Sequence, residues 1–294
     1  MSLPHNLSPE PDEIWPEPDT NAGAGPDVPE SGQAARLAPI ATPAAPAFPA
    51  WSAWDLLAVL GFAFVCVFVF SVAALFIARA LPGYRDMSLP DLAAKLKTNT
   101  RVAVGAQAAA YPFVLLGIFV MVRSRAQQRF REAIHWNWPG FSAPFLFVSG
   151  IVLAVAIEAL SRFLPIPKSL PVDSYFNDAT SAYLMAAFGT TLAPLLEELV
   201  FRGMLYPLLR RPFGLIIAIA VTAAAFAAIH GAQLGYAWAP ILSIFVVGVV
   251  FTVVRVRTDS VASSFVVHCG YNFSLFAMLW IASDHFRHLE KVTG

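Results

Sequence analysis

The chain has 294 residues, of which 57% are hydrophobic and only 13% are charged, and its formal net charge is zero. Soluble globular domains carry about 25% charged residues, so this composition indicates a membrane protein. The balanced charge, and the lack of any basic run with interleaved aromatic residues, argue against nucleic acid as a partner.

Residues 1–50 differ in composition from the rest of the chain. They hold eleven of the 23 prolines, and their acidic residues cluster between Glu10 and Glu30. A segment of this kind cannot bury a core, so we predict a disordered, acidic, Pro/Ala-rich tail. The remaining chain divides into membrane helices and loops at 51–180, a second membrane region at 181–283 and a C-terminal tail at 284–294.

Seven apolar segments approach or exceed the roughly 20 residues that cross hydrocarbon as a helix. They therefore predict an all-α, polytopic transmembrane bundle of about seven helices. The segments are Trp54–Ala78, Val102–Val122, Phe141–Phe163, Ala182–Leu209, Phe213–His230, Ala237–Val254 and Val261–Ser283. Between the first two, a short amphipathic stretch around Leu92 to Leu96 is expected to lie on the membrane surface.

Basic residues in short loops predict which side of the membrane each loop faces. Eight arginines follow the second, fourth and sixth predicted helices: Arg123, Arg125, Arg129, Arg131, Arg210, Arg211, Arg255 and Arg257. These loops are expected in the cytoplasm, which places the N-terminus there and the C-terminus outside. Five basic residues between Arg79 and Arg101 fall on the opposite side and weaken this prediction.

Two adjacent acids, Glu197 and Glu198, interrupt the fourth apolar segment. Ionised groups in hydrocarbon cost several kcal/mol each on insertion scales, so they usually mark chemistry or transport. Glu198 and Arg202 are four residues apart and share a helical face, whereas Glu197 points elsewhere. We expect Glu198 and Arg202 to form an internal clamp and Glu197 to face a cavity as a general base. Pro194, one turn before Glu198, is expected to kink this helix.

Two histidines supply further polar groups in separate apolar segments. His230 ends the fifth segment, while His268 and Asn272 are four apart in the seventh and project to one side. An imidazole can accept a proton, orient water or bind a metal, and an amide can donate to a developing oxyanion. Together with Glu197, these side chains would supply the groups needed for acyl transfer to water.

Three motifs in order resemble those of the CPBP family of intramembrane proteases. They are Glu197-Glu198-Leu-Val-Phe-Arg202-Gly203, the run from Phe226 to His230, and the run from His268 to Asn272. This family includes the type II CAAX prenyl proteases and the bacterial Abi-type and bacteriocin self-immunity proteins. The resemblance covers about the last 110 residues, and it implies peptide-bond hydrolysis within the membrane by a catalytic core at 181–283.

The resemblance also implies roles for individual residues. Glu197 would activate water with help from His230, while His268 and Asn272 would position water or stabilise the oxyanion; Glu198 and Arg202 would be architectural. The family has been described both as metalloproteases and as glutamate-dependent proteases. Glu197, His230 and His268 could also bind a divalent metal such as Zn with water in the open position, so both mechanisms stay open.

The expected substrate is a membrane-embedded or membrane-attached peptide or protein, with the lipid bilayer as the other partner. The Ala- and Pro-rich composition is typical of a bacterial chain, so we expect an integral protein of the bacterial cytoplasmic membrane and no prenylated CAAX substrate. Two alternatives stay open. One is a non-catalytic binding or immunity protein of the same family, and the other is a proton-coupled transporter.

Overall fold

A computed structural model describes residues 48–97, 99–138 and 140–291 of the chain. The predicted disordered tail, apart from residues 48–50, lies outside these described residues. Within the described ranges the chain forms helices and loops without any β-strand, which confirms the all-α prediction. Trp51 already belongs to the packed part of the protein, because its side chain is buried and its indole Nε1 donates to the Met204 carbonyl at 3.2 Å.

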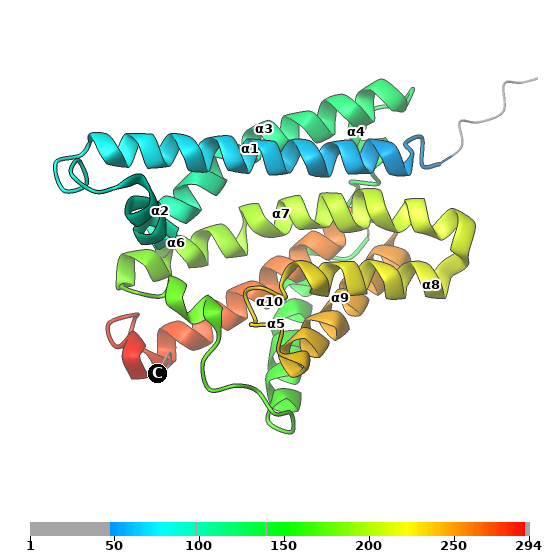
Figure 1. The fold of residues 1–294 in the computed structure, drawn as a ribbon. Helices are drawn as coiled ribbons and strands as arrows, with labels where there is room; N and C mark the ends of the chain where they lie inside the picture. The colour runs from blue at the N-terminus through cyan, green and yellow to red at the C-terminus, as the bar shows by residue number, and fades with distance from the viewer. Residues whose placement is uncertain (1–47, 98, 139, 292–294) are drawn as a thin grey trace, which may run out of the picture. The chain divides into compact units, whose positions relative to one another are not determined.

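The helices follow one another along the chain, and a longer loop with one 3₁₀ turn connects α5 to α6 (Figure 1). They are α1 (Ala53–Ala80), α2 (Leu89–Lys97), α3 (Thr100–Arg125), α4 (Phe130–Ala133), α5 (Ala143–Ser161), α6 (Ala179–Thr190), α7 (Leu192–Glu198), the π-helix η2 (Leu199–Leu205), α8 (Tyr206–Ile229), α9 (Trp238–Thr258) and α10 (Val261–Ala282). Short 3₁₀ turns, η1 (Pro171–Tyr175) and η3 (Leu289–Lys291), complete the described chain.

Six helical stretches of the described chain are long and apolar enough to cross a membrane. Five of these stretches each correspond to one predicted segment. The remaining stretch, Ala179–Ile229, has 51 residues. A straight helix of that length would span about 75 Å, far beyond the hydrocarbon thickness. The chain instead reverses at Gly214, where φ is 78°, and Figure 1 shows α8 running back beside α7. The two arms account for the fourth and fifth predicted segments.

Polar residues placed just before the long helices explain where these helices begin. Ser52 accepts a hydrogen bond from the Asp55 amide, and the Asp55 carboxylate accepts one from the Ser52 amide at 2.9 Å. This reciprocal pair satisfies backbone donors that the first helical turn leaves free. Side chains that accept from an amide three residues later also precede α3, α5, α6 and α10: Asn99, Ser142, Asp178 and Ser260.

The short amphipathic helix predicted around Leu92 to Leu96 is α2. Two of its leucines, Leu92 and Leu96, are buried in a small cluster with Ala78 of α1, and Val102 of α3 packs against that cluster. The helix is therefore held by α1 and α3 through its apolar side. Its predicted position on the membrane surface stays a prediction.

The π-helix η2 joins two separate hydrophobic cores. Leu199 and Met204 belong to a core built mainly from α1 and α3. Phe201 belongs to a second core that contains residues of α5, α8, α9 and α10, including Phe226 and Phe251. A π-helix has wider turns than an α-helix, so its side chains point in directions that a continuous α-helix would not give. The same seven-residue segment also carries Arg202.

Helices α5 and α10 approach closely at a pair of glycines. A Cβ atom on Gly150 would lie 2.1 Å from the Val267 carbonyl oxygen, and one on Gly270 would lie 2.1 Å from the Phe147 carbonyl oxygen. Small residues at a membrane-helix crossing let the backbones meet in this way. Gly270 lies two residues after His268. This contact therefore holds α10, which carries part of the candidate site, in position against α5.

We expect Gly270→Ala to lower the thermal stability of the purified protein, because the new methyl group meets backbone atoms that cannot rotate away. Gly105→Ala in α3 is the matched control, since no atom lies within 4 Å of its added Cβ. Melting curves of the two variants in detergent provide the test. Equal melting temperatures would show that α5 and α10 can separate without loss of stability.

Candidate active site

A wholly buried ion pair lies at the centre of the site. Nη1 of Arg202 donates to Oε1 of Glu198 at 2.9 Å, and neither side chain is exposed. The two residues are one helical turn apart across the junction of α7 and η2. Glu198 and Arg202 thus form the ion pair that their spacing predicts.

The other nitrogens of Arg202 bind helix α9. Nη2 donates to the Gly248 carbonyl at 2.9 Å, and Nε donates to the Thr252 hydroxyl at 3.3 Å. The guanidinium also lies 4.5 Å from the ring centre of Phe226 and 5.4 Å from that of Phe251, within the range of cation–π contacts. A buried guanidinium that is paired on every nitrogen avoids the cost of an unsatisfied charge.

The carboxylate of Glu198 has two further partners, both on α10. The Ser264 hydroxyl donates to Oε2, and Nδ1 of His268 lies 2.9 Å from Oε1. An ionised carboxylate can only accept, so Nδ1 of His268 is the protonated ring nitrogen in this contact. Glu198 therefore fixes both the orientation and the tautomer of His268.

The second ring nitrogen of His268 faces Glu197. Nε2 lies 3.7 Å from Oε2 of Glu197, which is too long for a direct hydrogen bond. The Glu197 side chain is 22% exposed, whereas those of Glu198 and His268 are 0% and 3% exposed. Of the two adjacent acids, Glu197 is thus the one that solvent or a substrate can reach, as predicted from their helical spacing.

A break between α6 and α7 precedes the two acids. Thr191 ends α6 with φ −123° and ψ −76°, and Pro194 lies in the first turn of α7. Proline has no amide hydrogen and its ring conflicts with the carbonyl four residues earlier, so a break here is expected. The predicted kink is therefore present, three residues before Pro194.

Asn272 binds the backbone at this break. Its Nδ2 donates to the carbonyl of Gly189, near the end of α6, at 2.7 Å, and the side chain is partly buried. The predicted oxyanion donor thus ties α10 to α6. A primary amide has two hydrogens, so one remains for another acceptor.

His230 directly follows the last residue of α8. Its Nδ1 lies 2.8 Å from the Phe226 carbonyl oxygen, which leaves Nε2 without a hydrogen bond in the described structure. Its ring centre is 5.0 Å from that of Phe226, which is itself 5.7 Å from that of His268. The structure brings the two histidines to one aromatic side chain, but within the described ranges no hydrogen bond joins His230 to Glu197.

The described residues contain no group of three or more His, Cys, Asp or Glu side chains that could hold a metal ion. Glu197, His230 and His268 therefore do not form a fitted metal site in this geometry. His268 is oriented by its contact with Glu198, and Glu197 lies 3.7 Å from its other ring nitrogen.

Several residues of this network do not follow from the sequence prediction: Gly248, Phe251, Thr252 and Ser264. Ser264 could have been found, because Ser264, His268 and Asn272 follow one another at four-residue spacing along α10. Gly248 and Thr252 also lie four apart, but nothing in the sequence indicates that this part of α9 meets Arg202. Such contacts between distant segments depend on the packing of the helices.

The described chain is an integral membrane protein of the all-helical class, with a Glu/His/Asn cluster between its helices. Residues 179–274 match the family model described as "Type II CAAX prenyl endopeptidase Rce1-like". This match confirms the resemblance found from the three motifs and supports, at the level of the family, a CAAX-type intramembrane protease. No curated protein and no solved structure matches the chain.

We expect Glu198→Gln to destabilise the protein, because it leaves the buried Arg202 guanidinium without its counter-charge. Breaking a buried pair in this way costs about 3–5 kcal/mol. Glu158→Gln, at an exposed position near the end of α5, is the matched control. Thermal unfolding in detergent measures both, and an unchanged melting temperature for Glu198→Gln would contradict the structural role of the pair.

Proposed function

We propose that the protein is an intramembrane endopeptidase in which Glu197 activates water. The observation that carries this proposal is the arrangement of His268 between the two glutamates. Nδ1 is bound to the buried Glu198, and Nε2 faces the partly exposed Glu197 at 3.7 Å. A general base that solvent reaches, next to an imidazole of fixed tautomer, is suited to hold and deprotonate a water molecule.

The tautomer of His268 defines how the water would be held. With Nδ1 protonated, Nε2 is an acceptor, and the Glu197 carboxylate is also an acceptor. A water molecule in hydrogen-bonding contact with both would donate one hydrogen to each, which directs its oxygen lone pairs toward a substrate carbonyl. Attack would form the carbon–oxygen bond while Glu197 takes the proton. Glu197 would then deliver that proton to the leaving amine nitrogen as the carbon–nitrogen bond breaks.

Asn272 and His230 are proposed to stabilise the tetrahedral intermediate and assist proton transfer. The second amide hydrogen of Asn272 is available for an oxyanion, since only one is used in the bond to Gly189. Nε2 of His230 has no hydrogen-bond partner in the described structure, so it is available to a substrate. These two roles come from the family resemblance, and the geometry is compatible with both.

The proposed substrate is a membrane-embedded or membrane-attached peptide or protein. Glu197 lies in a helical stretch long and apolar enough to cross the bilayer, and its helix α7 packs against α3 and α10, so a peptide bond would have to reach it from within or from the edge of the membrane. We further propose that the protein lies in a bacterial cytoplasmic membrane with its N-terminus in the cytoplasm, on the grounds of composition and of the arginine-rich loops.

Glu197→Gln is expected to abolish cleavage of a fluorogenic peptide library by detergent-purified protein, since the amide cannot take a proton from water. Its melting temperature should match that of the unaltered protein, because the nearest polar partner given for the Glu197 side chain in the described structure, Nε2 of His268, is 3.7 Å away and beyond hydrogen-bonding distance. Turnover by a folded Glu197→Gln variant would refute the mechanism. A folded unaltered protein without any turnover across the library would favour a binding role.

A strong chelator is expected to leave peptide cleavage unchanged, because the proposed mechanism uses the Glu197 carboxylate to deprotonate water and the described residues contain no group of three His, Cys, Asp or Glu side chains placed to hold a metal ion. The assay compares initial rates before and after chelation, followed by addition of Zn²⁺. Loss of cleavage that Zn²⁺ restores would instead show that Glu197 and the histidines bind a metal in the active protein.

A further inference from the structure

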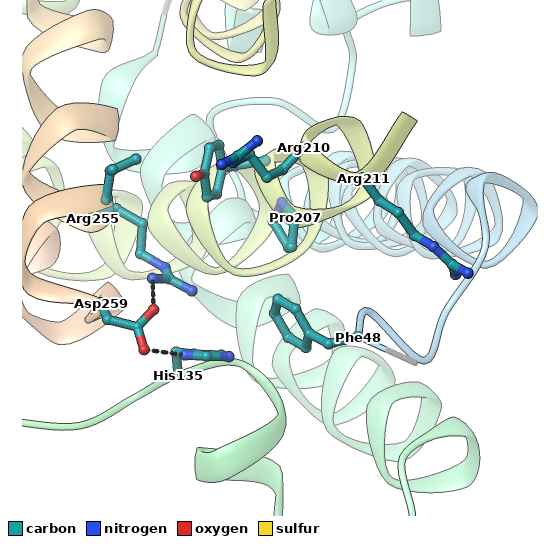
Figure 2. Close-up of a pocket in the computed structure, with 9 residues that line it drawn as sticks. Phe48, His135, Pro207, Arg210, Arg211, Arg255 and Asp259 are labelled. Atoms are coloured by element: carbon teal, nitrogen blue, oxygen red, sulfur yellow. Dashed lines mark hydrogen bonds and ion pairs between the residues drawn. The ribbon is translucent and has the colours of Figure 1, made fainter. Parts of the chain in front are cut away.

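A cavity lies beside the start of α8 and the end of α9, formed by residues that the proposed mechanism does not use. Its volume is about 380 Å³. It is lined by the segment before α1, the loop between α4 and α5, the first turns of α8 and the C-terminal end of α9: Phe48, His135, Tyr206, Pro207, Arg210, Arg211, Arg255, Val256 and Asp259. Figure 2 shows Asp259 between Arg255 and His135, and the ring of Phe48 lies against that of His135 with 4.5 Å between their centres.

The charge of this cavity is predominantly positive. Three arginines line it against a single carboxylate, Asp259. That carboxylate is already engaged, with Oδ1 2.7 Å from Nη1 of Arg255 and Oδ2 2.9 Å from Nδ1 of His135. Arg210 and Arg211 have exposed side chains and no ion-pair partner in the described structure. An excess of two positive charges therefore lines a concave site.

Arg255 lines this cavity, and one donor nitrogen of its guanidinium has no hydrogen-bond partner in the described residues. Its side chain is 3% exposed, and its Nε is buried without any hydrogen-bond partner in the described residues. Buried donors are normally satisfied, and an unsatisfied one costs about 1–3 kcal/mol. The planar guanidinium can bind a carboxylate and a phosphate at the same time, because it presents five hydrogens in a fixed fork.

We propose that this cavity binds the phosphate of an anionic phospholipid, with Arg210, Arg211 and Arg255 as its ligands. Basic pockets at the ends of membrane helices are suited to such headgroups. The phosphate would supply acceptors for the arginines and offset the excess positive charge. The apolar wall of Phe48, Pro207 and Val256 would contact the carbon atoms next to the phosphate.

A lipid fits this site better than a free anion because exposed apolar residues continue from it. Phe213, Ile216 and Ile217 follow Arg211 across the chain reversal and are 56%, 81% and 51% exposed. A phospholipid whose headgroup lies in the cavity could extend its acyl chains along such a surface. Free phosphate would gain nothing from these residues.

Binding of a short-chain phosphatidylglycerol to the detergent-purified full chain, measured by native mass spectrometry or calorimetry, tests the proposal. The double variant Arg210→Gln/Arg211→Gln should weaken binding about tenfold or more. The control is Arg129→Gln/Arg131→Gln, which removes the same charge from exposed positions outside the cavity. Phosphatidylcholine and inorganic phosphate are the comparison ligands, and both should bind more weakly than phosphatidylglycerol.

Asp259→Asn gives a test in the opposite direction. Removing the only carboxylate of the cavity should strengthen phosphatidylglycerol binding several-fold, which a merely misfolded variant would not do. Equal losses from the two arginine pairs would show nonspecific surface charge and overturn the proposal. Binding of inorganic phosphate or phosphatidylcholine as tight as that of phosphatidylglycerol would overturn the assignment to an anionic lipid. Failure of Asp259→Asn to strengthen binding would remove the cavity as the site.

Discussion

The carboxylate of Glu198 and the guanidinium of Arg202 lie together where no solvent reaches them, and the surrounding helices are arranged to compensate both charges. Arg202 needs acceptors from α9, and Glu198 needs donors from α10. A buried charge that loses a partner is strongly destabilising. The segment α7–η2 and the helices α9 and α10 must therefore pack so that both charges keep their partners. His268 is one of these required donors, so its position beside Glu197 follows from the same constraint.

The long apolar runs were sufficient to predict the helices, because a bilayer requires about 20 apolar residues for each crossing. The reversal between Leu209 and Phe213 was also expected, and the structure places it at Gly214, whose positive φ suits a residue without a Cβ atom. Neither the close crossing of α5 and α10 nor the π-helical turns of η2 could be foreseen. Both depend on which segments meet in space, and a sequence pattern along one helix carries no such information.

The same limit applies to the candidate site. Four-residue spacing correctly paired Glu198 with Arg202 and placed His268 and Asn272 on one side of α10. It could not show that His268 bridges Glu198 and Glu197, since that geometry joins α10 to α7. It also gave Asn272 no structural partner, whereas the structure ties its amide to Gly189. The ring of His230 lies 5.0 Å from that of Phe226, and its contact with a substrate stays a prediction.

The π-helix η2 limits which insertions and deletions this part of the chain can tolerate. A π-turn accommodates one residue more than an α-turn, and side chains advance by about 100° per α-helical residue. Deleting one residue between Leu199 and Leu205 would remove that extra residue and let the segment relax to an α-helix, which leaves α7 and α8 near their present rotation but changes the direction of side chains within the segment. Arg202 could then no longer reach Glu198, Gly248 and Thr252 together. Substitutions in η2 that preserve its packing are therefore compatible with the fold, whereas insertions and deletions there are not.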